Sequence, residues 1–525
     1  MRALVLTLAL LAAGTSAASA APPFQTTWRI TKDHWSAEDE RGFGAFVTAL
    51  GESGCNSAQS CLRSSANPWR GTDGDFIDID ADCAKLPYLL RGYYAWKNGL
   101  PFGYAAVSGE RFSTGGNRVV TRLSITDRGA GIDANRALRQ MMGSVFSGTF
   151  RVDPGSPYGL PSDFYSPALQ PGSIRPGTVI YDTNAHVGIV YKVDASGRIH
   201  YMDGHPDYTI TRSVYGAQFG RSPMQLGGGL KNWRPMRLMG ARWNGRSLTG
   251  GDVVVTPQRS IPDYSLVQYL GTDGRGNFAY GGAALGYYEY VRVAVSGGRT
   301  DFNPVYELQA GMRTLCNDLG DRAQAVNQAV ANGISVKPHP GRLPPNIYLA
   351  ADAEWEAYAT PARDARLRAA FVQLRNDLSR MIGLWLARDP RIVHDGLFLK
   401  DDLLRVYDQQ STACRVTYLT SDKRPVTLTF DDMARRLLSM SFDPYHCEEL
   451  RWGDAAAPSC DDPAATRRWY EVEEPMRAEI GRDGPAGGSV PNGSMARGIS
   501  GADVDIRGLI QNMPARTPFG QRLPG

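Results

Sequence analysis

The sequence predicts an α+β protein in which a unit of short strands and helices precedes a mainly helical unit. Between Thr27 and about Arg237, short β-branched and aromatic runs alternate with Gly- and Pro-rich turns and with one amphipathic helical stripe. From Asn303 onward, apolar residues recur at the 3/4 spacing of helices. We therefore expect a first unit with a β-rich end over residues 27–300 and a helical unit over residues 301–480.

Residues 1–20 have the pattern of a secretory signal peptide. A single positive charge precedes an apolar run from Leu4 to Ala13, and a small-residue triplet ends at Ala20. This run is shorter than the roughly 20 residues that a membrane span needs, and no later segment is long and apolar enough to cross a bilayer. The sequence predicts an exported protein, periplasmic or extracellular, with no membrane span.

The composition argues against several classes of function. The 57 basic and 53 acidic side chains leave a formal net charge of +4 on 525 residues, with the two signs interspersed. No basic tract is present, so nucleic acid is not an expected partner. The stretch GTDGRG lacks the following helix of a phosphate loop, and no GxSxG motif stands beside a usable histidine. We expect no cofactor, and the sequence leaves the oligomeric state open.

The cysteines predict disulfides with one sulfur left over, because an oxidising compartment pairs structural thiols. The chain has seven cysteines, and their spacing favours two local rings and one long-range bridge: Cys55–Cys61, Cys447–Cys460 and Cys316–Cys414. Cys83 is then the unpaired residue. Spacing alone does not fix the connectivity, and a bridge from Cys83 to Cys55 or Cys61 is the alternative.

Two segments contain several potential metal ligands. CNSAQSC, residues 55–61, has neither the CxxC spacing nor the companion histidines of a zinc site. The acidic stretch from Asp73 to Asp82 lacks the glycine and the terminal glutamate of an EF-hand loop. We interpret it as a solvated turn and expect no metal at either segment.

An amphipathic helix is predicted directly after Cys83. Apolar residues from Leu86 to Leu100 follow the 3/4 spacing, and Gly99 is a stop signal. Pro87 removes a helical hydrogen bond unless it lies in the first turn. The helix therefore begins a residue or two after Cys83, or its first turn is irregular.

Three β-branched and aromatic runs predict neighbouring strands at residues 177–182, 186–193 and 198–203. The turn residues from Asp194 to Gly197 join the last two runs into a hairpin. Residues 242–299 continue to alternate Val, Tyr and Thr with Gly-rich turns, and we interpret them as further strands that either complete the first unit or form a small β module.

Helical patterns dominate the second unit. They cover residues 305–330, 367–385 and, more weakly, 397–407 and 430–440. Gly333 is placed as a C-cap of the first helix, and a hairpin is expected between the last two. The Gly- and Pro-rich end, residues 481–525, is predicted to be largely disordered.

Cys83 has the position of a catalytic thiol. The thiolate is the nucleophile, and a helix N-terminus or a neighbouring imidazolium lowers the thiol pKa from about 8.5. Asp82 can cap the helix with its side chain, which leaves backbone N–H groups near the sulfur, where an oxyanion could also bind them. A histidine from elsewhere in the fold is still needed as the base.

Among the seven histidines, only His186 opens a run with a strong strand pattern. A strand end holds an imidazole on a rigid element, as a general base requires. If the hairpin turn has four residues, His186 lies opposite His205 and diagonal to Asp203. We predict Asp203 as the group that orients the imidazole and His205 as the next candidate, whereas a one-residue change of register favours His200. The histidines outside the hairpin are expected to be incidental.

The order of these elements resembles the NlpC-type cysteine peptidases and amidases of bacterial cell walls, within the papain-like group. The matching segments are DADC at residues 80–83, which opens a helix, and PGTVIYDTNAHVGIVYKV at residues 176–193. The resemblance implies a papain-like N-terminal domain with a small antiparallel sheet and a Cys-bearing helix. It also implies Cys83 as the nucleophile, His186 as the base, and Asp203 or a neighbour as the third residue.

Two hypotheses from different classes follow. The first is an exported cysteine hydrolase that cleaves an amide or peptide bond, with peptidoglycan or a peptide as its substrate. The chain departs from the family at Ala84-Lys85, where Ser-Gly is usual, and residues 84–185 separate the nucleophile from the base. This departure and the unassigned helical unit motivate the second hypothesis, a non-catalytic envelope protein that binds cell-wall peptide or scaffolds a partner.

Overall fold

The computed structural model describes residues 25–73, 78–299, 301–344, 346–456, 460, 463–477 and 504–514. The predicted signal peptide, residues 1–20, lies outside the described residues. Helices and small antiparallel sheets are both abundant, so the predicted α+β class is confirmed. None of the helices in the described ranges combines the length and the apolar character that a membrane crossing needs.

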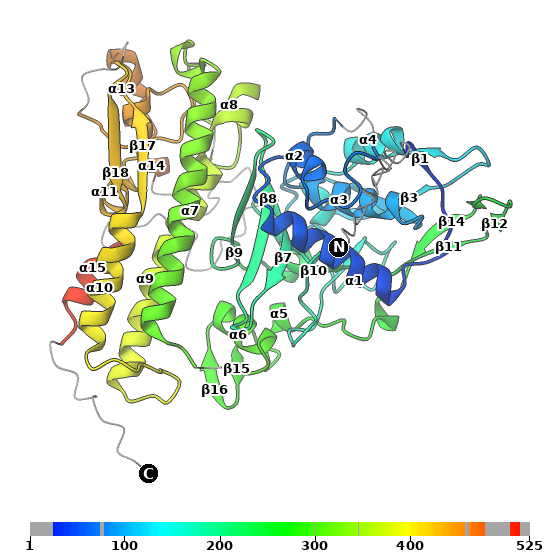
Figure 1. Ribbon diagram of the computed structural model, residues 1–525, viewed down its shortest axis with the longest axis horizontal. Coiled ribbons are helices and arrows are strands. Elements are labelled where there is room, and N and C mark those ends of the chain that lie inside the picture. Colours follow the sequence, from blue (N-terminus) through cyan, green and yellow to red (C-terminus); the bar gives the residue numbers. More distant parts are fainter. Residues whose placement is uncertain are drawn as a thin grey trace, which may run out of the picture.

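The elements are shown in Figure 1. The helices are α1 (Ala37–Glu52), α2 (Ala58–Arg63), α3 (Lys85–Lys97), α4 (Ala134–Ser144), α5 (Val267–Leu270), α6 (Tyr287–Val295), α7 (Pro304–Ala331), α8 (Ala353–Tyr358), α9 (Pro361–Leu386), α10 (Leu399–Ala413), α11 (Phe430–Arg436), α12 (Glu448–Arg451), α13 (Pro463–Val472), α14 (Glu474–Arg477) and α15 (Ile506–Gln511). The strands are β1 (Thr27–Trp28), β2 (Phe102–Ser108), β3 (Arg118–Ile125), β4 (Ile132–Asp133), β5 (Phe164–Tyr165), β6 (Val179–Asp182), β7 (His186–Val193), β8 (Ile199–Gly204), β9 (Ile210–Val214), β10 (Gly229–Trp233), β11 (Met236–Met239), β12 (Arg242–Trp243), β13 (Leu248–Thr249), β14 (Asp252–Val255), β15 (Phe278–Tyr280), β16 (Ala283–Leu285), β17 (Arg415–Leu419) and β18 (Pro425–Thr429).

The largest sheet in the described residues has six strands in the order β5-β10-β6-β7-β8-β9, and every neighbouring pair is antiparallel. β6, β7 and β8 are the three runs that the sequence predicted as strands, and β7 and β8 form the expected hairpin. In Figure 1 this sheet lies between the N-terminal helices and the long helices α7, α9 and α10.

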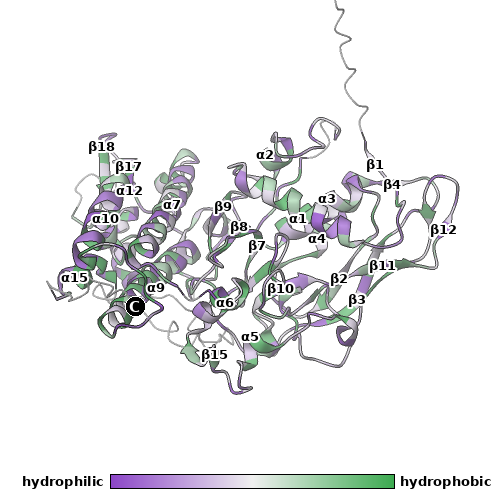
Figure 2. Ribbon diagram, turned by 60° about the horizontal axis from the view of Figure 1, so that its bottom comes forward, coloured by the Kyte–Doolittle hydropathy of each residue, from purple (hydrophilic) through white to green (hydrophobic). Residues whose placement is uncertain are grey.

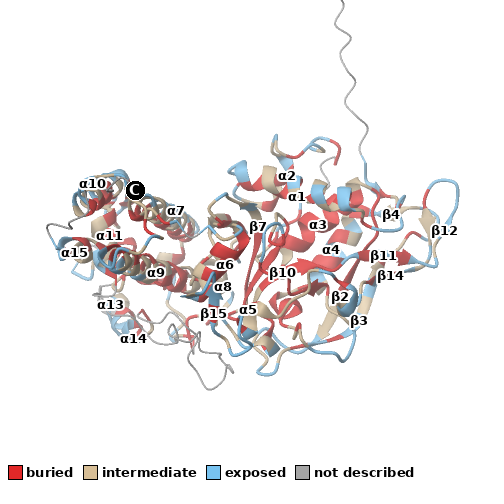
Figure 3. Ribbon diagram, turned by 90° about the horizontal axis from the view of Figure 1, so that it is seen from below, coloured by how far each residue is buried: buried red, intermediate tan, exposed pale blue. Residues whose placement is uncertain are grey.

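Two hydrophobic cores cover the two faces of the six-stranded sheet. Val187 and Ile189 pack on one face with α1 and α3, whereas Ile180 and Val190 pack on the other face with α6. Successive residues of a strand point to opposite faces, so burial on both sides produces continuous apolar runs such as VIYD and HVGIV. Figure 3 shows this buried centre, with α3 and β7 coloured as buried.

The helix after the cysteine begins at Lys85, so the expectation of a start one or two residues beyond Cys83 is confirmed. Asp82 caps it, since its Oδ1 accepts the backbone N–H groups of Ala84 and Lys85 at 3.1 Å each. Pro87 lies in the first turn, where a backbone N–H has no helical partner to lose. Nearly all of α3 is buried, which fixes the chain around Cys83 against the sheet.

The second half of the chain is built on three long helices, because α7 packs against both α9 and α10. Apolar and polar residues alternate around these helices, as Figure 2 shows. The disulfide Cys316–Cys414 ties α7 to the residue that follows α10. Gly333 has a φ of 67° just past α7, as the C-cap prediction requires, and β17 and β18 form the expected hairpin.

Two segments differ from the sequence predictions. The stretch predicted as strands over residues 242–299 ends in a helix, α6, because four of its apolar residues have helical spacing and pack under the sheet: Tyr287, Tyr290, Val291 and Ala294. Within the end predicted to be disordered, residues 504–514 are described and include α15 (Ile506–Gln511), which packs on α9 and α10. Three buried apolar residues of this segment recur at 3/4 spacing: Ile506, Ile510 and Met513. The rest of residues 481–525 lies outside the described residues.

The helical half packs directly on the β9 edge of the sheet, where α7 lies against β9. Arg363 of α9 donates to Asp207, with Nη2 2.9 Å from Oδ2. Glu307 of α7 accepts from both Arg198 and Arg292, at 2.7 and 2.8 Å. These ion pairs hold the helices over the ends of β8 and β9.

Candidate active site

The β7–β8 hairpin differs from the expected turn by one residue and compensates with a bulge. Val193 pairs with Ile199 rather than with Arg198, and the register then shifts before Ile189 pairs with Met202. The second pairing is the one that the predicted four-residue turn would have produced. The bulge therefore restores the expected alignment between the start of β7 and the end of β8.

His186 and Asp203 form a buried hydrogen-bonded pair. Nε2 of His186 lies 2.5 Å from Oδ2 of Asp203, and the side chains are 8 % and 3 % exposed. Burial raises the pKa of Asp203, but His205 and the hydrogen bond from His186 outweigh it and hold this pKa well below the ordinary value. An ionised carboxylate only accepts hydrogen bonds, so Nε2 carries the proton and Nδ1 is the basic nitrogen of His186.

His205 and His200, the other two candidates for the group that orients the imidazole, lie in different parts of the hairpin. Nε2 of His205 lies 2.8 Å from Oγ1 of Thr211, and the Thr211 hydroxyl donates to Oδ1 of Asp203 at 2.6 Å. His205 is therefore part of the network around Asp203. His200 lies near the turn of the hairpin, where its Nε2 is 3.3 Å from Oδ2 of Asp194, so it does not reach the network.

Cys83 is the cysteine that remains unpaired among the seven, all of which are described. The other six form the three disulfides that their spacing favoured. Sγ of Cys83 lies 3.7 Å from the carbonyl oxygen of Ala185 and accepts a hydrogen bond from the backbone N–H of Val187. The sulfur thus touches the backbone on both sides of His186.

A hydrogen bond between Cys83 and an imidazole nitrogen of His186 is not among the contacts of the described residues. Strand alternation is the reason. Val187 packs on the face that α3 covers, so His186 points to the opposite face, where its ring stacks on Phe219 with the centroids 5.8 Å apart. Cys83 packs with the core on the α3 face. The two residues are neighbours at the start of β7, but the expected dyad contact is not formed in this conformation.

The pKa values of Cys83 and His186 indicate that both side chains are uncharged at neutral pH. Burial raises the pKa of the Cys83 thiol to about 12, and the negative charge of Asp82 adds to the rise. Burial lowers the pKa of His186 to about 4, and the positive charge of Arg366 acts in the same direction. The first N–H groups of α3, expected near the sulfur, donate instead to the Asp82 carboxylate. At neutral pH the pair is a thiol beside a neutral imidazole.

Charged side chains from α7 and α9 complete the surroundings of Asp203, and the sequence analysis did not single them out. A cavity of about 50 Å³ separates the network from these helices, and its lining includes Asp318, Asp321, Arg363 and Arg366. Burial raises the pKa of Asp318 to about 8 and that of Asp321 to about 6. In the sequence, these four residues could have been recognised as charged positions within otherwise apolar helical stripes.

A larger cavity, of about 400 Å³, lies between the hairpin turn, α6, α7 and α9. Its lining includes Tyr215, Tyr287, Tyr288 and Asp377. Neither Cys83 nor the Asp203 network borders it, so it is a separate space from the candidate active site.

The segments considered for metal binding have other roles. Asp73, predicted in a solvated turn, is buried and forms an ion pair with Lys97, and it accepts a hydrogen bond of 2.7 Å from Tyr93. Residues 74–77 lie outside the described residues. Cys55 and Cys61 form a disulfide and so supply no thiolate ligands.

Comparison of the chain with protein-family models, with curated proteins and with solved structures finds no match. The likeness to NlpC-type enzymes therefore rests on residues 80–83 and 176–193 alone. The class that the fold itself defines is an α+β protein with a six-stranded antiparallel sheet.

Proposed function

We propose that this protein is an exported cysteine hydrolase that cleaves an amide or peptide bond in cell-wall peptides, with a papain-like domain formed by the sheet, α1 and α3. The observation that carries the proposal is the 2.5 Å contact between His186 and Asp203, placed beside the one cysteine outside the disulfides. The three disulfides fit the oxidising compartment that an exported protein enters.

In the proposed reaction, the Cys83 thiol transfers its proton to Nδ1 of His186 while the sulfur attacks the carbonyl carbon of the amide. An acyl–sulfur bond forms, the C–N bond breaks, and His186 returns the proton to the leaving amine. Water, activated by the same nitrogen, then releases the acid and regenerates the thiol. Asp203 keeps Nδ1 as the basic nitrogen throughout. The mechanism requires one rearrangement, in which the sulfur exchanges the Ala185 carbonyl for Nδ1.

The test is the digestion of purified peptidoglycan with the wild type and with Cys83→Ala. We expect the wild type to release soluble peptides and Cys83→Ala to release none. His200→Gln is the matched control, because His200 lies outside the network and its loss should leave product release unchanged. Full activity of Cys83→Ala would end the proposal.

A second candidate function is that of a non-catalytic envelope protein that binds cell-wall peptide. The observation that favours it is the Cys83 thiol, whose pKa is about 12 and whose sulfur faces a backbone carbonyl. A thiol whose pKa is raised this far above neutral is inert at pH 7. This function predicts that wild type and Cys83→Ala sediment equally with peptidoglycan and that neither releases products. Product release by the wild type alone excludes it.

A further inference from the structure

Three potential metal ligands and a neighbouring histidine, from three distant segments, meet in the helical half, outside the candidate active site. The potential ligands are Asp443, His446 and Glu473, and the neighbouring histidine is His339. One ligand atom each from Asp443, His446 and Glu473 lies within 4.8 Å of the other two. His339 joins them from the segment after α7, with its Nε2 2.9 Å from Oδ2 of Asp443. Asp443, His446 and Glu473 are at most 1 % exposed.

His446 has the orientation of a metal-binding histidine. Its Nδ1 lies 2.5 Å from Oγ of Ser441, and its Nε2 lies 3.7 Å from Oδ2 of Asp443. A histidine that binds a metal through one nitrogen usually donates the other N–H to a polar neighbour, which fixes its tautomer. Ser441 is placed to accept from Nδ1, and this leaves the lone pair of Nε2 directed to the side of Asp443.

Two atoms of the cluster are buried without a hydrogen-bond partner among the described residues: Nε2 of His446 and Oε2 of Glu473. Buried polar atoms in native proteins are nearly always paired, so these two call for a ligand. Arg477 donates to Oε1 of Glu473 at 3.2 Å and does not satisfy Oε2.

We propose that Asp443, His446 and Glu473 bind a divalent cation of the zinc class. One imidazole nitrogen and two carboxylate oxygens are a ligand set that suits zinc. The backbone N–H of Gly341 donates to Nδ1 of His339, so Nε2 of His339 carries the proton and donates to Asp443, which it holds in place. The ion joins the loop before α12 to the turn between α13 and α14.

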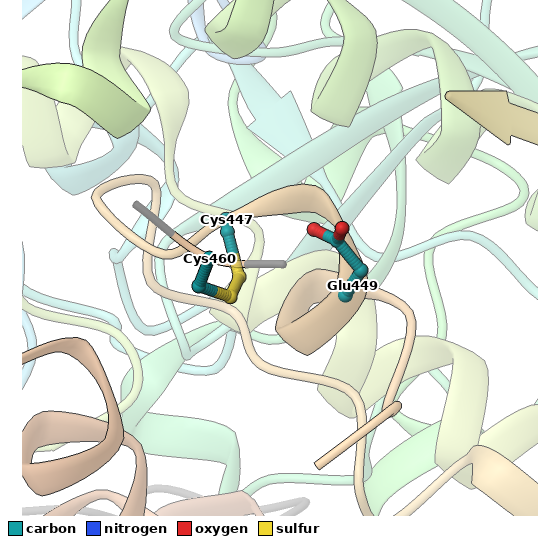
Figure 4. Close-up of side chains that lie close together, drawn as sticks. All are labelled: Cys447, Glu449 and Cys460. Atoms are coloured by element: carbon teal, nitrogen blue, oxygen red, sulfur yellow. A yellow bond between two sulfur atoms is a disulfide. The ribbon is translucent and has the colours of Figure 1, made fainter. Parts of the chain in front are cut away.

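A neighbouring cluster holds part of this site in place. Cys447, Glu449 and Cys460 also lie close together, as Figure 4 shows, but the two sulfurs form a disulfide and so are not thiolate ligands. The disulfide fixes the chain immediately after His446. On the other side, Oδ1 of Asp443 accepts the backbone N–H of Tyr445 at 2.8 Å.

The experiment uses the full chain with its disulfides intact, stripped with a chelator and titrated with zinc sulfate against a chromophoric competitor. We expect one zinc ion per wild-type chain and a rise in the thermal unfolding temperature on zinc addition. Glu473→Gln and His339→Gln should each weaken zinc binding about tenfold or more and remove most of that rise. His394→Gln is the matched control, because His394 is another buried histidine paired with a carboxylate, at 2.9 Å from Asp402.

Zinc binding that is absent in the wild type, or equal in the wild type and both cluster variants, overturns the proposal. A loss that also occurs in His394→Gln overturns it as well. If the buried Glu473→Gln variant does not fold, His339→Gln at the rim of the cluster and cobalt substitution of the wild type decide the matter. The cobalt spectrum of a four-coordinate nitrogen and oxygen site supports the proposal, and the spectrum of hydrated cobalt contradicts it.

Discussion

Nε2 of His186 lies 2.5 Å from Oδ2 of Asp203, and this contact joins the first residue of β7 to the end of β8. It orients the imidazole without any participation of Cys83, whose sulfur bonds to the Ala185 carbonyl. The orientation of the His186 imidazole and the protonation state of the Cys83 thiol are therefore separate properties, and each can be tested by itself.

Replacing Asp203 by Asn tests whether the carboxylate charge orients the His186 imidazole. The neutral amide no longer fixes the proton on Nε2, so we expect peptidoglycan hydrolysis to fall about 100-fold or more. The free energy of unfolding in urea should fall by about 1–3 kcal/mol, because buried donors of His186 and Thr211 lose their charged acceptor. Asp301→Asn, at an exposed position, is the control and should change neither quantity. Activity at the wild-type level in Asp203→Asn would contradict the assigned role.

His186 should make the stability of the fold sensitive to acid. Burial lowers its pKa from 6.5 to about 4, so below pH 6.5 the unfolded chain binds a proton that the folded chain does not. The free energy of unfolding then decreases as the pH falls from 6.5 toward 4. When the pH is lowered from 7 to 5, the free energy of unfolding measured in urea should fall by about 2 kcal/mol less in His186→Gln than in the wild type. Equal losses in the two proteins would show that this imidazole is not held neutral.

The Cys83 thiol should react slowly with iodoacetamide at pH 7. Because burial raises its pKa to about 12, the alkylation rate of the folded protein should rise about tenfold per pH unit up to pH 9 or beyond. Asp82→Asn removes a negative neighbour, lowers the thiol pKa and should speed alkylation at a given pH. The protein unfolded in urea provides the reference of an ordinary thiol. A rate that is high and constant between pH 6 and pH 8 would instead indicate a thiolate–imidazolium pair.

The long-range disulfide should stabilise the fold more than the short one. Cys316–Cys414 closes a separation of 98 residues, whereas Cys55–Cys61 closes a separation of 6. Loop entropy predicts that the free energy of unfolding falls by about 4–5 kcal/mol in the double alanine variant of the first pair. For the double alanine variant of the second pair, the predicted fall is about 2 kcal/mol. Urea unfolding of both variants measures the difference. A larger loss from the short ring would mean that native contacts, not loop length, dominate.

The elements that the sequence predicted correctly are those whose pattern is local. The spacing of apolar residues determined α7 and α9, and the β-branched runs determined β6, β7 and β8. Asp82 and Pro87 set the start of α3 through the chemistry of a single turn. The pairing of His186 with Asp203 was also accessible, because residues two apart on a strand share a face.

The features that could not be predicted depend on which helix covers which face of the six-stranded sheet. Alternation places His186 on the face of Val190, but nothing local shows that α3 covers the opposite face. Arg366 reaches the network from α9, far along the chain. His446 lies in an irregular segment, where the sequence has no period to expose its meeting with Glu473.

The position of α9 determines the direction from which His186 can be approached. Its Arg363 and Arg366 line the cavity on the side of Asp203 and His205 that faces the helices, so in the proposed hydrolase a substrate would have to come along the strand ends where Cys83 lies. A chain shortened at residue 300 would lose this wall and admit water to the imidazole. The pKa of His186 would then return toward that of a free histidine, so the helical half sets the basicity of a residue that it does not contain.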